Sequence, residues 1–224
     1  MNYFSLDAID QILESTWLNF DNGYFIELGA NDGICQSNTL YFERYRGWKG
    51  ILVEPILHKF FTCKANRRAS KVFCNACVSF DYKLPCVELW YSNLMTSSLG
   101  VETELDPLAQ AQLGNKFLSD VEEVVRTASI AITLDELMQR ASSPKYIDFL
   151  SIDVEGAEAE VINGINFYTY RFGVLCIESR EPEKIISLVS PFGYKYIQSI
   201  GQNVIMAHRD AKPSQSKDDP LVVF

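Results

Sequence analysis

The chain has 224 residues, of which 29 are acidic and 20 are basic, so its formal net charge is −9. This length predicts one domain that buries a core without disulfide or metal cross-links, and a hydrophobic content of 47% excludes a disordered or fibrous protein. The negative charge disfavours nucleic acid as a partner, and no apolar run reaches the roughly 18 residues that a membrane span needs.

Taken in chain order, apolar periodicity and turn residues predict alternating helices and strands. Up to residue 78 the expected elements are a helix (5–19), a strand (24–28), a helix (38–46), a strand (50–53), a helix (56–68) and a strand (71–78). After residue 132 they are a helix (134–141), a strand (146–152), a helix (157–163), a strand (172–177), a helix (182–189) and two hairpin strands (194–200 and 203–208). This alternation predicts an α/β fold with a mostly parallel sheet and an antiparallel strand at the end of the chain.

The middle of the chain, about 84–132, is less regular. Residues 87–91 alternate like a strand, whereas residues 92–119 are rich in Ser, Thr, Asn and Gln and predict one short helix at 107–113. A loop of this length inside a domain is typically a lid or a binding loop. A disordered insertion fits the composition equally well.

Acidic residues occupy the carboxyl ends of four predicted strands, which is where open α/β sheets bind their ligands. Glu27, Glu54, Asp153 and Glu178 take these positions, and Glu155 follows closely on the third strand. Each acid alone is explained by the favourable charge at a helix N-terminus. Four together are not, because clustered carboxylates repel and raise one another's pKa. The pattern predicts a functional site along this edge.

The loop after the first strand reads E-x-G-x-x-x-G, from Glu27 through Gly29 to Gly33. It is not the G-x-G-x-x-G dinucleotide fingerprint, because Asn31 stands in place of the second glycine, and no Gly-Lys-Ser/Thr follows as in a P-loop. Glu54 lies 21 residues after Gly33, the separation at which an acid binds ribose hydroxyls. Loop and acid together predict a nucleoside site without a pyrophosphate cradle.

Several segments, in matching order from about residue 22 to residue 180, resemble the FkbM family of S-adenosylmethionine-dependent methyltransferases. They are FIELGANDG (25–33), SNT (37–39), GWKGILVEP (47–55), TLD (133–135) and DFLSIDVEGAE (148–158). The resemblance implies a class I methyltransferase (Rossmann-like) fold, whose seven-stranded, mostly parallel sheet is flanked by helices and has an antiparallel last strand. It also implies S-adenosylmethionine as the methyl donor and a hydroxyl group as the acceptor.

The resemblance further implies which residues bind the cofactor. They are Glu27, Gly29, Asn31 and Gly33 (methionine and ribose), Ser37 and Asn38 (amino-acid end), Glu54 (ribose diol), Pro55 and Ala76 (adenine) and Asp153 (near the point of methyl transfer). Residues 92–119 do not align with the family, so acceptor specificity is expected there.

The acceptor hydroxyl must lose its proton during methyl transfer, and the acids at the strand ends offer two routes. In the first, Asp153 or Glu155 is the base, with a pKa raised by neighbouring acids. In the second, Asp153 and Glu178 bind Mg²⁺ or Mn²⁺, which lowers the pKa of the hydroxyl. Asp153, Glu155 and Glu178 are therefore the expected catalytic residues.

The expected function is O-methylation of a carbohydrate hydroxyl, in a free sugar, a nucleotide-linked sugar or a glycan. The alternatives are O-methylation of a small natural product and a non-catalytic cofactor-binding module of a larger protein. We expect a single methyltransferase domain over 1–209, with an N-terminal helix within 1–21 and a flexible tail over 210–224, which suits one domain of a multidomain protein. Six cysteines typical of reduced thiols and no recognisable signal peptide predict a cytoplasmic location.

Overall fold

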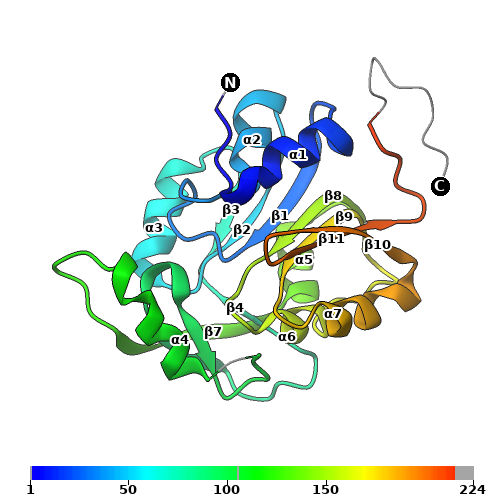
Figure 1. The fold of residues 1–224 in the computed structure, drawn as a ribbon. Coiled ribbons are helices and arrows are strands. Elements are labelled where there is room, and N and C mark those ends of the chain that lie inside the picture. Colours follow the sequence, from blue (N-terminus) through cyan, green and yellow to red (C-terminus); the bar gives the residue numbers. More distant parts are fainter. Residues whose placement is uncertain (1, 105, 215–224) are drawn as a thin grey trace.

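The computed structural model describes residues 2–104 and 106–214, and its central element is a seven-stranded sheet in the order β10-β11-β9-β8-β1-β2-β3 (Figure 1). The parallel strands are β1 (Tyr24–Leu28), β2 (Lys49–Val53), β3 (Lys71–Phe73), β8 (Tyr146–Ile152) and β9 (Arg171–Glu178). Strand β11 (Asn203–His208) is antiparallel to both β9 and β10 (Tyr194–Ile200). The predicted α/β fold with a mixed sheet is confirmed.

Helices cover both faces of this sheet (Figure 1). One face carries α1 (Ile9–Thr16), which follows the 3-10 turn η1 (Leu6–Ala8), together with α2 (Leu40–Arg46) and α3 (Leu57–Asn66). The other face carries α5 (Leu134–Ala141), α6 (Glu158–Ile162) and α7 (Pro182–Val189). Successive residues of a strand point to opposite faces, so Phe25 packs with the first group and Ile26 with the second.

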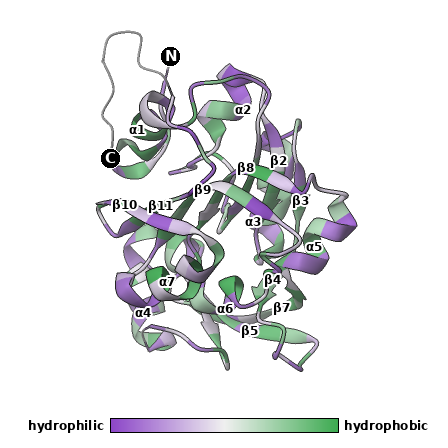
Figure 2. Cartoon of the chain, turned by 90° about the vertical axis from the view of Figure 1, so that its right-hand side faces the viewer, coloured by the Kyte–Doolittle hydropathy of each residue, from purple (hydrophilic) through white to green (hydrophobic). Residues whose placement is uncertain are grey.

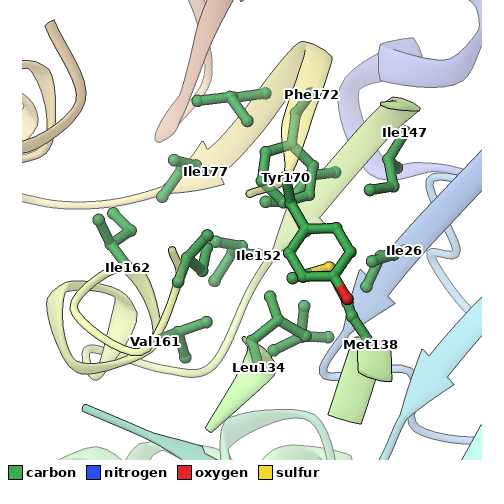
Figure 3. Close-up of a cluster of buried hydrophobic side chains, with 14 of the residues drawn as sticks. Ile26, Leu134, Met138, Ile147, Ile152, Val161, Ile162, Tyr170, Phe172 and Ile177 are labelled. Carbon is green, nitrogen blue, oxygen red and sulfur yellow. The ribbon is translucent and has the colours of Figure 1, made fainter. Parts of the chain in front are cut away.

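The larger of the two cores lies between the sheet and helices α5 to α7. Figure 3 shows Ile26 and Ile152 of the sheet near Leu134 and Met138 of α5, and all four side chains are at most 1% exposed. Hydrophobic and hydrophilic residues occur together in the helices around the sheet (Figure 2), as expected for helices with one buried face. The close-packed cores hold the strands rigidly, and with them the residues at the strand ends.

A second sheet of four strands, in the order β4-β7-β5-β6, lies beside the first. Its strands are β4 (Ala76–Val78), β5 (Cys86–Tyr91), β6 (Ser97–Leu99) and β7 (Val125–Thr133). The prediction of one strand over 71–78 is therefore wrong, because β3 ends at Phe73 and β4 pairs instead with β7 in the second sheet. Strand β7 was not predicted, because its first four residues are exposed and show no apolar alternation.

The segment 92–119 is largely ordered. It contains the 3-10 turns η2 (Asn93–Met95) and η3 (Gly114–Phe117), strand β6, and helix α4 (Pro107–Leu113). Helix α4 confirms the predicted short helix, and Asp106 caps it by accepting a hydrogen bond from the Ala109 N–H at 2.8 Å. For the described residues of this segment, the alternative of a disordered insertion is wrong.

Most other element boundaries agree with the predictions to within a few residues, although the helix expected over 5–19 covers only Ile9–Thr16. Thr133 caps α5 as predicted, accepting from the Glu136 N–H at 3.1 Å. All six cysteines lie in the described part of the chain and are free thiols. No helix in the described ranges has both the length and the apolar character to cross a membrane. Residues 215–224 of the predicted tail lie outside the described residues.

Candidate active site

A cavity of about 300 Å³ lies at the carboxyl ends of β1, β2, β8 and β9, within the size range of small-molecule pockets. The structure brings nearly all of the predicted site residues into its lining. Those present are Glu27, Gly29, Asn31, Ser37, Asn38, Glu54, Pro55, Ala76, Asp153, Glu155 and Glu178. Among the predicted residues, Gly33 is the exception, since it does not line the cavity.

Glu54 lies at the end of β2 and is fixed by two backbone groups. Its Oε2 accepts from the Asn31 N–H and its Oε1 from the Ile56 N–H, both at 2.8 Å. Burial raises the pKa of Glu54 to about 7, against the opposing effects of these hydrogen bonds and of Lys59. Asn31 adopts a left-handed conformation, with φ of 46°, which turns the first loop toward this carboxylate. A buried carboxylate is therefore held at the cavity edge.

Glu27, at the end of β1, organises the start of the following segment. Its carboxylate accepts from the Ser37 hydroxyl at 2.9 Å, the Asn38 N–H at 2.8 Å and the Thr39 hydroxyl at 2.5 Å. The Asn38 side chain in turn donates to the Ser151 hydroxyl of β8 at 2.9 Å. Glu27 thus positions Ser37 and Asn38 at the cavity wall as well as lining it.

Gly33 lies behind the cavity wall, against helix α3. An added β-carbon there would lie 2.7 Å from Cγ of Arg67 and 2.9 Å from Sγ of Cys63. The left-handed φ of 78° also favours glycine. Gly33 therefore makes room for the Arg67 side chain rather than for a ligand.

Asp153, Glu155 and Glu178 form an acidic cluster in which one carboxylate oxygen from each lies within 4.8 Å of the others. Loss of water contact, and then a shared hydrogen bond and repulsion with Glu178, hold the pKa of Asp153 well above its ordinary value. Burial and the Glu178 charge raise the pKa of Glu155 to about 8, although Gln110 and Arg180 oppose the rise. Acids with raised pKa values in a cleft are candidates for proton transfer.

The backbone around this cluster is strained and held by a buried acid. Glu155 has a left-handed φ of 55°, a conformation that is unfavourable for a residue with a side chain. Oε1 of Glu158, which is 1% exposed, accepts from the N–H groups of Val154 at 3.0 Å and Gly156 at 3.1 Å. Burial raises the pKa of Glu158 to about 7. Glu158 therefore supports the turn that presents Asp153 and Glu155.

The segment 92–119 closes one side of the cavity. Gln110 of α4 donates a hydrogen bond to Oε2 of Glu155, and the Arg180 N–H donates to Glu104 at 2.7 Å. The Asn31 amide donates to Oδ1 of Asn93 at 3.1 Å. Asn93, Leu94, Met95, Thr96, Ser98, Lys116 and Phe117 line the cavity from this segment.

Gln110 and Arg67 are two buried residues that contact site residues without lining the cavity, and neither was predicted from the sequence. Gln110 lies in a polar stretch, and only the fold brings it to Glu155, 45 residues along the chain. Arg67 belongs to a basic cluster typical of a surface, yet its side chain is fully buried.

The lining has the character of a site for a ligand that is part aromatic and part cationic. Carboxylates stand at the ends of β1, β2, β8 and β9, and Leu28, Val53, Ala76 and Cys77 supply apolar walls between β1, β2 and the second sheet. A sulfonium or ammonium group is favoured by the acids, and a purine ring by the apolar walls. The residues present therefore fit S-adenosylmethionine, which carries all three groups.

The sequence model of the family described as Methyltransferase FkbM domain matches residues 27–196 of the chain. No curated protein matches the chain in sequence.

The solved structures that match this chain share little sequence with it. The (4+2)-cyclase SpnF is 9% identical with a TM-score of 0.44, over 86% of this chain and 59% of the cyclase. A precorrin-6y C5,15-methyltransferase from Geobacter metallireducens is 10% identical with a TM-score of 0.42. The match covers 89% of this chain and 84% of that methyltransferase. A SAM-dependent methyltransferase from Aquifex aeolicus is 9% identical with a TM-score of 0.39. The match covers 92% of this chain and 97% of that methyltransferase. Similarities of this size carry no conclusion about activity.

Proposed function

We propose, because this chain belongs to the FkbM methyltransferase family, that it transfers a methyl group from S-adenosylmethionine to a carbohydrate hydroxyl. The acceptor is a free sugar, a nucleotide-linked sugar or a sugar of a glycan. Family membership supports the methyltransferase activity and the donor. The observation that supports a hydroxyl acceptor is the convergence of Asp153, Glu155 and Glu178 beside the cavity that the proposed cofactor residues line.

The strand order supports the class I methyltransferase (Rossmann-like) arrangement. In this arrangement the seven-stranded sheet, with β11 as its antiparallel member, forms the methyltransferase domain proposed for residues 1–209. The smaller sheet and the segment 92–119 then form the acceptor side of the site.

In the proposed complex, Glu54 accepts hydrogen bonds from the ribose hydroxyls, and Pro55 and Ala76 border the adenine. Glu27, with the Ser37 and Asn38 that it orders, surrounds the amino-acid end. When bound, S-adenosylmethionine supplies an electrophilic methyl group on a positively charged sulfur. The acidic lining favours that positive charge.

The acidic cluster would take the acceptor proton. The acceptor oxygen has to be aligned with the methyl group and deprotonated by the end of the step. Asp153 or Glu155 accepts this proton, since raised pKa values make both carboxylates stronger bases than ordinary acids. The nearby charge of Glu178 increases the basicity of Asp153 by repulsion.

A divalent cation is a second candidate for activating the hydroxyl, supported by the close approach of carboxylate oxygens in the cluster. Asp153 and Glu178 would hold Mg²⁺ or Mn²⁺, which prefer oxygen ligands. The bound ion would lower the pKa of the hydroxyl. Methylation abolished by EDTA and restored by Mg²⁺ or Mn²⁺ would support the cation, and activity that survives exhaustive chelation would exclude it.

The test is a screen of acceptors with the purified chain and S-adenosylmethionine. S-adenosylhomocysteine release and the mass of the acceptor are measured for free sugars, nucleotide sugars and glycans, with small hydroxylated natural products in parallel. Methylation of a sugar that is lost in Asp153→Asn supports the proposal. Methylation of natural products and of no sugar favours the alternative of a natural-product O-methyltransferase. Cofactor binding without turnover of any acceptor favours a non-catalytic module.

A further inference from the structure

We propose that Arg67 is a positioning residue for the amino-acid end of the cofactor, acting from behind the cavity wall. It would do so by holding Glu27 and Ser37, both of which line the cavity, in the geometry that the ligand needs. This inference rests on the proposed function, because it takes these two residues to border S-adenosylmethionine.

Arg67 follows the end of α3, and its side chain is completely buried. Its guanidinium donates from Nη1 to the Ser37 hydroxyl at 3.0 Å and to the Gly33 carbonyl at 3.1 Å. It donates from Nη2 to the Thr39 hydroxyl at 2.8 Å. One side chain therefore joins three positions of the loop that runs from β1 to α2.

Two carboxylates compensate the buried charge of this guanidinium. Oε2 of Glu27 lies 3.5 Å from Nη1, and Oε2 of Glu43 lies 3.1 Å from Nε. The guanidinium carbon also lies 5.3 Å from the centre of the Phe25 ring. A buried ion is tolerated only with such partners, so the position of Glu27 depends on that of Arg67.

Arg67 is in direct contact with residues that line the cavity. Ser37 accepts from Arg67 and donates to Glu27, and Thr39 does the same. Arg67 itself does not line the cavity. It therefore acts through Glu27 and Ser37 and touches no ligand.

Lysine would not replace this arrangement. Arginine presents its donors in a rigid planar fork, whereas lysine carries a single ammonium group on a flexible stem. The acceptors on Ser37, Gly33 and Thr39 are spread over two nitrogens of the fork. The Arg67→Lys variant keeps the charge beside Glu27 and loses the simultaneous contacts to the loop.

The two ends of the cofactor site should respond differently to this change. Arg67 contacts the residues assigned to the amino-acid end, whereas Glu54, assigned to the ribose, is held by the N–H groups of Asn31 and Ile56. Loss of the arginine fork should therefore weaken ligands that carry the amino-acid part. Adenosine, which lacks that part, is the discriminating probe.

The experiment is calorimetric titration of the full chain and its Arg67→Lys variant with S-adenosylmethionine, S-adenosylhomocysteine and adenosine. Arg68→Lys is the matched control, since Arg68 is the exposed neighbour. We expect Arg67→Lys to weaken both amino-acid-bearing ligands about 10- to 100-fold and adenosine by less than about twofold. Arg68→Lys should leave all three affinities unchanged.

Two results would overturn the inference while leaving the proposed function intact: unchanged affinities in Arg67→Lys, or an equal loss for all three ligands. If Arg67→Lys does not fold by circular dichroism, Thr39→Val tests the same contacts, because it removes the acceptor for Nη2 and the donor to Glu27. Thr39→Val should show the same selective loss for the two ligands that carry the amino-acid part. Wild-type affinities for all three ligands in Thr39→Val would also overturn the inference. A wild-type chain that binds neither S-adenosylmethionine nor S-adenosylhomocysteine would instead refute the proposed function.

Discussion

The carbonyl oxygen of Asp153 occupies the place that a side chain on Gly29 would need, since a β-carbon there would lie 1.8 Å from it. Gly29 also has a left-handed φ of 79°, and the Asp153 N–H donates to the carbonyl of Leu28 at 3.3 Å. The ends of β1 and β8 are thus in direct backbone contact. This contact brings Asp153, a member of the acidic cluster, to the loop that follows β1.

Replacing Gly29 with alanine should separate these two strand ends. Gly100 provides a matched control, because it has a similar φ of 72° but open space around it. We expect Gly100→Ala to lower the free energy of unfolding by about 1 kcal/mol, from backbone conformation alone. Gly29→Ala should lose about 3 kcal/mol or more, because a backbone clash is added. Urea denaturation measures both, and equal losses would show that the Asp153 carbonyl does not obstruct a β-carbon at position 29.

The contrast between Gly29 and Gly33 shows what could be predicted from the sequence and what could not. A buried apolar run that ends in an acid marks a strand end, so Glu27, Glu54, Asp153 and Glu178 could be placed at one edge. The sequence pattern could not distinguish a glycine that faces the cavity from one that accommodates Arg67. That distinction depends on which side of the loop α3 packs, which only the tertiary structure defines.

The same limit explains the missed parts of the second sheet. A strand is recognised by one buried face, and β7 is exposed over its first four residues. The break between Phe73 and Ala76 was missed because both halves of 71–78 are apolar and continuous in sequence. Pairing partners far along the chain, β2 for one half and β7 for the other, separate them.

Gln110 should set the pH at which the acidic cluster works. Its hydrogen bond favours the charged form of Glu155 and so lowers the pKa of that residue, which burial and the Glu178 charge nevertheless raise to about 8. In Gln110→Met the pKa of Glu155 should rise further. The pH at which kcat/KM increases, as Glu155 loses its proton, should therefore be higher by about one unit. The pH profile of methyl transfer measures this shift.

The exposed Gln112 of the same helix supplies the control, and Gln112→Met should keep the wild-type profile. A Gln110→Met profile that does not move, or that moves to lower pH, would show that Glu155 does not carry the rate-determining ionisation.

Glu158 should make the fold less stable as pH rises. Its pKa is about 7 in the folded chain, against an ordinary value of 4.5. Between these values the folded state binds the proton and the unfolded state does not. The contribution of Glu158 to stability is therefore complete below about pH 4.5 and lost as pH rises through 7. This loss amounts to about 3 kcal/mol.

Glu158→Gln keeps the acceptor for the N–H groups of Val154 and Gly156 and removes the ionisation. Relative to wild type, we expect the variant to gain about 3 kcal/mol of unfolding free energy between about pH 4.5 and pH 8. Denaturant unfolding across this range measures the difference, with the exposed Glu123→Gln as the baseline. A pH-independent difference would mean that folding does not raise the pKa of Glu158.

The central claim is that the cavity binds S-adenosylmethionine through the acids at the strand ends, and calorimetric titration with this cofactor tests it most directly. We expect micromolar binding by the wild type and at least about tenfold weaker binding by Glu54→Gln, because the ribose hydroxyls lose a charged acceptor. The surface variant Glu88→Gln should bind like the wild type, since Glu88 pairs with Arg126 on the outside of the second sheet. Wild-type protein that binds neither S-adenosylmethionine nor S-adenosylhomocysteine would contradict the account.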